Sequence, residues 1–388
     1  MRRRNTVSSV VFATLITSLM YSDISAQPRQ VGETAEQSRS SEHTAKAIRL
    51  KPFIYIDRNG MGIEAFSMLI PTGWRFEGGI RWVLDNPGMP AYAAFQVSDP
   101  GRTQEFEVFP NQPFFWTTNQ TLLSTFPVGS RYFGSEVRPI VSPVEALRQI
   151  VIPRFRQNVT KPKIVNAQPL PELAQALGAG GVSQPGVSIG AEAAKMRIEY
   201  EVRGTAMEEE IYCVVETLTF PIQTMFGMVY NTNWYVDYIF SFKSEKGKFE
   251  DACKGLQTIA SSFELNLKWF NKYCQVVEYL IKRQIHHIQS IGQLSRIIAQ
   301  MSDEIRNENL QSYQHRQAVN DKIVDNFCRY IRGVEQYYDP IKEQPVELPS
   351  GYKNAWTNSL GEYILTEDLS FNPNIGSNIN WQKIERKK

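Results

Sequence analysis

The chain has 388 residues, of which 42% are hydrophobic, 21% charged and 12% aromatic. This composition is typical of a folded protein with two or three domains, and it excludes wholesale disorder, a collagen-like repeat and a multispan membrane protein. Four cysteines are too few for a fold built on disulfides.

Residues 1–26 have the pattern of a secretory signal. The basic run Arg2-Arg3-Arg4 precedes an apolar stretch over residues 10–20, and cleavage after Ala26 suits the small residues there. The stretch is shorter than the ~20 residues of a spanning helix, and an uncleaved anchor is the alternative. Removing the signal takes away three arginines and one aspartate, which leaves no formal net charge. We therefore expect an exported protein, periplasmic or extracellular, with no transmembrane anchor after cleavage and no affinity for nucleic acid.

The remaining chain divides by pattern into four units. Residues 27–49 are polar and predict a disordered linker. Residues 50–265 predict an α+β domain, an antiparallel sheet covered by helices. Residues 266–339 predict a long helical segment or hairpin, and residues 340–388 a small β module and tail.

Strand patterns dominate the first folded unit. The turn Asp57-Arg58-Asn59-Gly60 follows an apolar run and predicts a hairpin, and residues 74–83, 91–98 and 105–116 are further strand candidates. Apolar and charged residues alternate strictly over 196–203, and less cleanly over 234–243. Such alternation gives a sheet one apolar face and one polar face, which is typical of antiparallel sheets.

Two helices are predicted to cover the apolar face. One begins at Ser142-Pro143, where serine caps the helix, and is predicted to end or kink at Pro153. The other spans about 245–264, where apolar residues from Phe249 to Phe263 follow a helical spacing. A weaker helix near 171–177 precedes a glycine-rich loop over 178–190, which lacks the spacing and lysine of a phosphate-binding loop.

The element order resembles the PsbP-like family. The likeness rests on Pro71-Thr72-Gly73-Trp74 after an apolar strand, and on the strand and helix over 234–263. The resemblance implies a non-catalytic binding or assembly module of an uncharacterised exported bacterial protein. It supplies no active-site residues.

The helical unit carries two apolar stripes. The first has a near-heptad spacing from Ile281 to Ile305 and extends back to Trp269, and the second runs from Ile323 to Tyr338. An intrachain contact is the favoured interpretation, and self-association through residues 277–305 is the alternative. His286 and His287 are adjacent, so they cannot chelate one metal from a helix, and no metal or cofactor is predicted.

The C-terminal unit predicts a meander of short strands around Trp356, Gly361 and Trp381. Its aromatic residues are expected to dock on the rest of the chain, with sugar binding as the alternative. The four cysteines allow three pairings, of which Cys213 with Cys253 and Cys274 with Cys328 are the disulfide hypotheses, and inert packing is the alternative for Cys213 and Cys253. The run Glu208-Glu209-Glu210 is interpreted as a solvated strand edge.

No catalytic motif emerges, so we predict a binding or scaffolding protein whose partner is an envelope protein or a glycan. An apolar groove is the candidate ligand site, with core filling as the alternative reading of the same residues. The residues that could line the groove are Phe109, Phe114, Phe115, Trp116, Met225, Phe226 and Met228. Trp356 and Trp381 of the last unit are separate candidates for ligand binding. The alternative function is a secreted hydrolase of cell-wall or glycan material, acting through paired carboxylates near 117–140 or 178–190.

Overall fold

A computed structural model provides the structure of the protein. It describes residues 47–83, 89–159, 162–176, 187–225, 227–283, 291–314, 317–318 and 334–386. The predicted signal, most of the predicted linker and all four histidines lie outside these residues. The last three linker residues, 47–49, begin the first strand.

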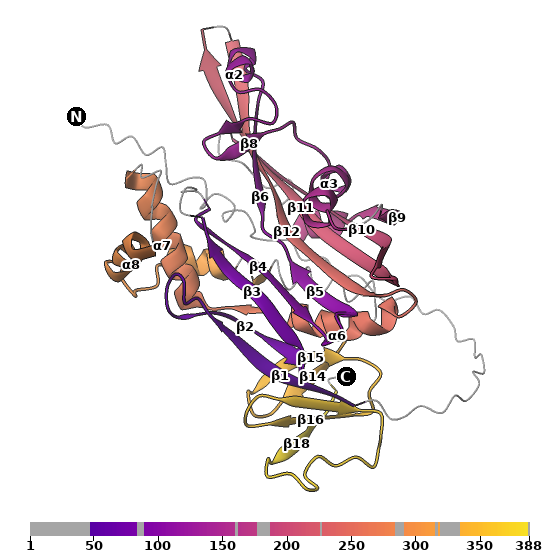
Figure 1. The fold of residues 1–388 in the computed structure, drawn as a ribbon. Helices are drawn as coiled ribbons and strands as arrows, with labels where there is room; N and C mark the ends of the chain where they lie inside the picture. The colour runs from indigo at the N-terminus through magenta and orange to yellow at the C-terminus, as the bar shows by residue number, and fades with distance from the viewer. Residues whose placement is uncertain are drawn as a thin grey trace, which may run out of the picture.

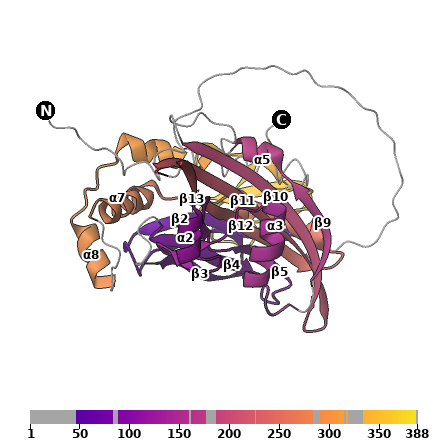
Figure 2. The same cartoon turned by 90° about the horizontal axis from the view of Figure 1, so that it is seen from above.

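A large sheet forms the centre of the molecule (Figures 1 and 2). Its strands, in spatial order, are β3 (Arg75–Trp82), β4 (Ala91–Ser98), β5 (Gln104–Val108), β12 (Gly227–Glu245), β11 (Thr205–Thr224), β10 (Ser188–Val202) and β9 (Lys163–Pro169). Neighbours along this path are antiparallel, as predicted. Three further strands extend the sheet from β12. β6 (Gln112–Thr117) pairs with β12, β8 (Ser135–Val137) pairs with β6, and β7 (Arg131–Tyr132) pairs with β8.

A second sheet joins the two ends of the described chain. Its order is β13 (Glu264–Leu265), β2 (Glu64–Pro71), β1 (Ala47–Ile56), β17 (Tyr363–Thr366), β16 (Asn354–Asn358) and β18 (Trp381–Ile384). β1 pairs with β17 from Ala47 opposite Thr366 to Leu50 opposite Tyr363. The predicted C-terminal module therefore shares a sheet with the first strand, because its short strands need a partner edge. A two-stranded ribbon, β14 (Val334–Asp339) and β15 (Gln344–Pro349), lies beside it.

Short helices pack on parts of both faces of the large sheet. α6 (Phe249–Ser261) buries Phe249, Cys253 and Leu256 against one face, as its sequence spacing predicted. On the other face, α3 (Pro143–Ala146) continues through a π-helical turn (Leu147–Val151) into α4 (Ile152–Phe155). Ser142 caps this helix by accepting from the Glu145 backbone N–H at 3.3 Å. α5 (Pro171–Ala176) packs near β10.

The predicted fold class is wrong. The protein is mostly β, with large curled sheets that form a half-barrel, and it is not an α+β sheet followed by a long helical segment. The predicted helical unit contains α7 (Leu267–Arg283), α8 (Ile291–Ala299) and a helical stretch over 307–314. Its end, from Val334, is strand β14. The apolar spacing did not predict this strand, because β-branched and aromatic residues occur in strands as well as on helix faces. Pairing with β15 places Val334–Asp339 in a strand.

The core has two large parts, one on each face of the large sheet. The part beneath α6 also takes in Trp269, Val277 and Leu280 of α7 and Leu294 and Ile298 of α8. These residues belong to the predicted near-heptad stripe, so the described part of the stripe makes an intrachain contact. The second part lies between α3, α4 and strands β10 to β12, around Trp234 and Met196.

β11 and β12 continue beyond the rest of the sheet as a long hairpin. β10 pairs with β11 as far as Thr219, and β6 pairs with β12 from Asn231 onward. The hairpin beyond these points projects from the top of the molecule in Figure 1, with α2 (Gln120–Thr125) beside it. The C-terminal strands lie at the opposite end. None of the helices in the described part of the chain is both long and apolar enough to cross a membrane.

Candidate functional site

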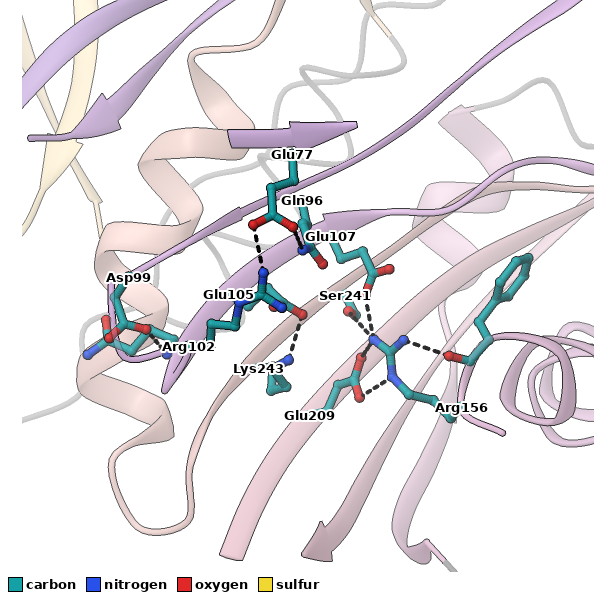
Figure 3. Close-up of polar contacts among 12 residues, drawn as sticks. Glu77, Gln96, Asp99, Arg102, Glu105, Glu107, Arg156, Glu209, Ser241 and Lys243 are labelled. Carbon is teal, nitrogen blue, oxygen red and sulfur yellow. Dashed lines mark hydrogen bonds and ion pairs between the residues drawn. The ribbon is translucent and has the colours of Figure 1, made fainter. Parts of the chain in front are cut away.

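A row of polar side chains crosses the large sheet on the face that α4 borders. Residues directly opposite one another on neighbouring strands share a face. The register places Ser98 of β4 opposite Glu105 of β5, Glu105 opposite Lys243 of β12, and Lys243 opposite Glu209 of β11. A second row, Glu77, Gln96, Glu107 and Ser241, runs beside it. We call these two rows, with Arg156 above them, the charged strip (Figure 3).

Arg156 holds the buried end of the charged strip. It follows α4, and its Nε donates to Glu209 Oε2 at 2.8 Å while Nη2 donates to Glu107 Oε2 at 2.8 Å. Its Nη1 donates to the Phe155 carbonyl at 2.9 Å. The side chain of Glu209 is 0% exposed and that of Arg156 is 10% exposed. The Tyr200 hydroxyl also donates to Glu209 Oε2, at 2.6 Å.

The electrostatics of the strip follow from burial and from this pairing. Burial opposes ionisation of Glu209, but Arg156 and the hydroxyl donors outweigh it, so its pKa lies below the ordinary value. Burial raises the pKa of Glu107, with repulsion from Glu105 and Glu209 added, and Arg156 only partly offsets this. Burial and the Glu209 carboxylate raise the pKa of Tyr200. The carboxylate of Glu209 is therefore held ionised, and that of Glu107 is the more easily protonated.

Every other carboxylate of the strip also has a partner. Glu105 Oε1 accepts from Lys243 Nζ at 2.6 Å. At the exposed end, Glu77 accepts from Arg102 at 2.6 Å and from Gln96 at 2.9 Å. The carboxylates of the strip are thus all paired with neighbouring side chains. A general acid or a nucleophile must be available to a substrate, and these carboxylates are already engaged.

The hydrolase hypothesis placed its paired carboxylates near residues 117–140 or 178–190, and neither segment contains two acidic residues. Residues 117–140 contain one acidic residue, Glu136, whose carboxylate is bound by Arg138 at 2.8 Å and by Arg154. Residues 178–190 contain none. Within the described ranges, no group of three or more potential metal ligands gathers.

The interpretation of Glu208-Glu209-Glu210 as a solvated edge is wrong. β11 lies between β10 and β12, so it is an interior strand of the sheet. Glu209 and Glu210 are 0% and 3% exposed. Glu210 points to the α6 face, where Lys195 Nζ lies 3.2 Å from its Oε1 and the Tyr212 hydroxyl also donates to it. The run of three acids gave no signal of burial, because the basic partners lie outside the strand, Lys195 on the neighbouring strand β10 and Arg156 after α4.

A second feature of the same sheet carries almost no charge. We define the arm as residues 112–135 and 217–234, which include β6, α2, β7 and the projecting ends of β11 and β12. Its single charged side chain is Arg131, whereas the whole chain is 21% charged. Uncharged groups hold the arm together. Thr117 Oγ1 donates to Asn231 at 2.6 Å, and the hydroxyls of Thr219 and Thr232 lie 2.9 Å apart.

The end of the arm exposes large apolar side chains. Met225, at the hairpin turn, is 90% exposed. Further exposed residues of the arm, on the hairpin and on the segment between α2 and β8, are Ile222, Met228, Tyr230, Val128 and Phe133. Exposed apolar residues on both faces of a projecting hairpin make it a candidate interaction site.

The predicted groove does not form as one site. Phe109, Phe114 and Phe115 are buried, and Phe114 stacks on Trp234 with ring centroids 4.3 Å apart, so the core-filling alternative is correct for them. Trp116 is half-buried in β6, and Phe226 lies outside the described residues. Trp356 and Trp381 belong to the second sheet, at the opposite end of the molecule from the arm. Trp381 is 4% exposed there, with Arg49 over its ring. Sequence reasoning did name Met225 and Met228, but as groove lining.

The predicted Cys213–Cys253 disulfide is also wrong. Both residues are buried free thiols. The pleat of β11 directs Cys213 toward α3, where its thiol lies 3.5 Å from the Pro143 carbonyl, whereas Cys253 of α6 packs on the opposite face. Burial raises the pKa of both thiols, so they are poor nucleophiles. Cys274 is half-buried, and Cys328 lies outside the described residues.

No protein-family model and no curated protein matches this chain. The resemblance to PsbP-like domains therefore stays a prediction.

Proposed function

We propose that this chain is an exported, non-enzymatic binding protein whose recognition element is the arm. The observation that carries the proposal is the contrast between a nearly charge-free composition and the exposed apolar side chains at the end of a projecting hairpin. Burial of such a surface against a partner is favourable because its apolar side chains leave water. The hairpin carries no charged side chain whose desolvation would oppose this burial.

Two further features support the proposal. The carboxylates of the charged strip are engaged by Arg156, Lys243 and Arg102, which favours a supporting role for them over a catalytic one. Residues 1–26 have the pattern of an export signal, which supports a place in the periplasm or outside the cell.

Site-specific photocrosslinking tests the proposal. A photoreactive phenylalanine analogue replaces Met225 in the full chain, expressed in the source cells. The matched control carries it at Ile375, which is 79% exposed and lies between β17 and β18 at the other end of the molecule. We expect an adduct with an envelope component, protein or lipid, at position 225 only. Equal adducts at both positions, or none at 225, contradict the proposal.

A glycan library incubated with the protein tests the hydrolase alternative. Turnover that disappears in Glu107→Gln, with the fold retained, would assign catalysis to the charged strip and reverse the proposal.

A further inference from the structure

We infer that the arm docks on the interface of a neutral phospholipid bilayer, with the hairpin turn at Met225 entering it. The inference rests on the proposed function and names the kind of surface that the arm contacts. Its three supports are the absence of charge, the shape of the hairpin end and the pattern of backbone pairing near the turn.

The first support is charge. Residues 217–234 contain no charged side chain, and Arg131 is the only one in residues 112–135. A protein interface typically has a polar rim in which arginine is enriched. Entry into a bilayer instead penalises each charged side chain, so a charge-free hairpin suits lipid better. Met228 and Tyr230 share one face of β12, and tyrosine is among the residues that favour the level of the headgroups.

The second support is shape. The projecting hairpin consists of two strands, and beyond Thr219 and Asn231 neither has another strand partner among the described residues. A specific protein interface of ordinary size buries roughly 800 Å² on each partner, which needs a broad surface or a deep pocket. A fluid bilayer adapts to a narrow, convex end. The hairpin in Figure 1 has this narrow form.

The third support limits the depth. Backbone groups on the outer edges of residues 220–224 and 227–229 need water, because hydrocarbon offers no hydrogen bonds, whereas the outward backbone groups of Tyr230 are already bonded to Thr118. Pro221 removes one such donor from the edge of β11. The turn therefore enters the boundary between headgroups and acyl chains, and the paired region from Asn231 onward stays outside. Arg131, whose Nη1 donates to the Gly134 carbonyl at 2.9 Å, is the one arm cation for a lipid phosphate.

Vesicle flotation tests the inference with residues 27–388, which contain every described residue and lack the apolar stretch of the predicted signal. The vesicles are phosphatidylcholine alone. We expect the chain to float with them, and Met225→Asp to weaken its partition coefficient by about tenfold, as the loss of one buried methionine side chain implies. Ile375→Asp, at a similarly exposed apolar position outside the arm, should float like the original chain.

Depth is measured with the same vesicles carrying brominated acyl chains. The fluorescence of Met225→Trp should be quenched, and that of the added tryptophan in Ile375→Trp should not. Adding phosphatidylglycerol should change the partition by no more than about fivefold, because Arg131 is the only arm cation.

The outcomes separate this inference from the proposed function. No flotation, or equal flotation of Met225→Asp, overturns the lipid inference. If crosslinking at Met225 then still captures a protein, the binding function stands with a protein partner. A dimer that Met225→Asp abolishes, seen by analytical ultracentrifugation, would assign the arm to a second copy of the chain and overturn the lipid inference as well.

Discussion

The charged strip and the arm share strands β11 and β12, and together they reverse the usual distribution of charged and apolar side chains between the interior and the surface. Near one end of β11 and β12, Glu209 and Lys243 lie in the buried part of the sheet, each bound to a partner. At the other end, Met225 and Met228 face solvent, and no charged residue lies between 217 and 234. Buried charges and exposed apolar side chains are the informative exceptions in a folded protein.

The difference between these regions separates stability from recognition. A buried carboxylate is tolerated only when its partner is present, so the buried pair of Arg156 and Glu209 in the charged strip is sensitive to the loss of its cation. An exposed methionine contributes little to the folded state, so the end of the arm is free to vary without unfolding the protein. Substitutions in the two regions should therefore give opposite results for stability and for binding.

The largest expected effect is on stability, in the charged strip. Arg156→Ala should lower the free energy of unfolding by about 3–5 kcal/mol, because Glu209 is left buried without its cation. Urea denaturation followed by tryptophan fluorescence measures the change. Arg102→Ala is the control, since Arg102 pairs with Glu77 at the exposed end and should cost less than about 1 kcal/mol. Similar losses of stability in both variants would contradict the assignment of Arg156 as the cation that stabilises buried Glu209.

A smaller, pH-dependent effect should distinguish the two carboxylates that Arg156 contacts. The pKa of Glu209 is lowered in the folded state, so its contribution is present above the unfolded-state pKa and is lost as the pH falls through the folded-state pKa. The stability advantage of the original chain over Glu209→Gln should therefore shrink as the pH falls below the ordinary value of 4.5.

Glu107 should show the opposite sign. Its pKa is raised in the folded state, so ionisation at neutral pH costs stability, and the cost disappears as the pH falls through the raised pKa. Relative to the original chain, Glu107→Gln should be most favourable at neutral pH and lose ground in acid. Urea denaturation over a pH series measures the stability of both variants relative to the original chain. If this difference changes with pH in the same direction for both, the two carboxylates do not differ in the sign of their pKa shift.

The smallest expected effect on stability is at the arm. Met225→Asp should change the free energy of unfolding by less than about 0.5 kcal/mol, since the side chain is 90% exposed. Thermal unfolding followed by circular dichroism measures it, alongside the flotation experiment. A large loss of stability would mean that the turn packs within the folded protein, and the comparison between the two regions would fail.

The sequence predicted local structure well where one side-chain pattern was sufficient. The alternation over 196–202 identified β10, the helical spacing from Phe249 identified α6, and Ser142 marked the start of a helix. The hairpin at Asp57–Gly60 was likewise correct, since β1 ends at Ile56 and β2 begins at Glu64. These features depend on neighbours within a few residues, where periodicity and capping act directly.

The candidate site was predicted only in part. The exposed Met225 and Met228 were named, but Phe109, Phe114 and Phe115, which were grouped with them, are buried. The charge-free stretches were readable in the sequence and supply the signal for the arm. Their meaning depended on the projection of the hairpin beyond β6 and β10, which no local pattern encodes.

The sequence by itself determined the identity of many strands, the position of α6 and the near absence of charge along the arm. Only the tertiary structure decided that Glu209 is buried, that Cys213 and Cys253 face opposite sides of a sheet, and that β1 pairs with β17. The reason is physical. Arg156 and Glu209 are 53 residues apart along the chain, and Ala47 and Thr366 lie in β1 and β17, near opposite ends of the described chain. Such pairs form only when the whole chain has folded, because their free energy comes from contacts that local propensity does not contain.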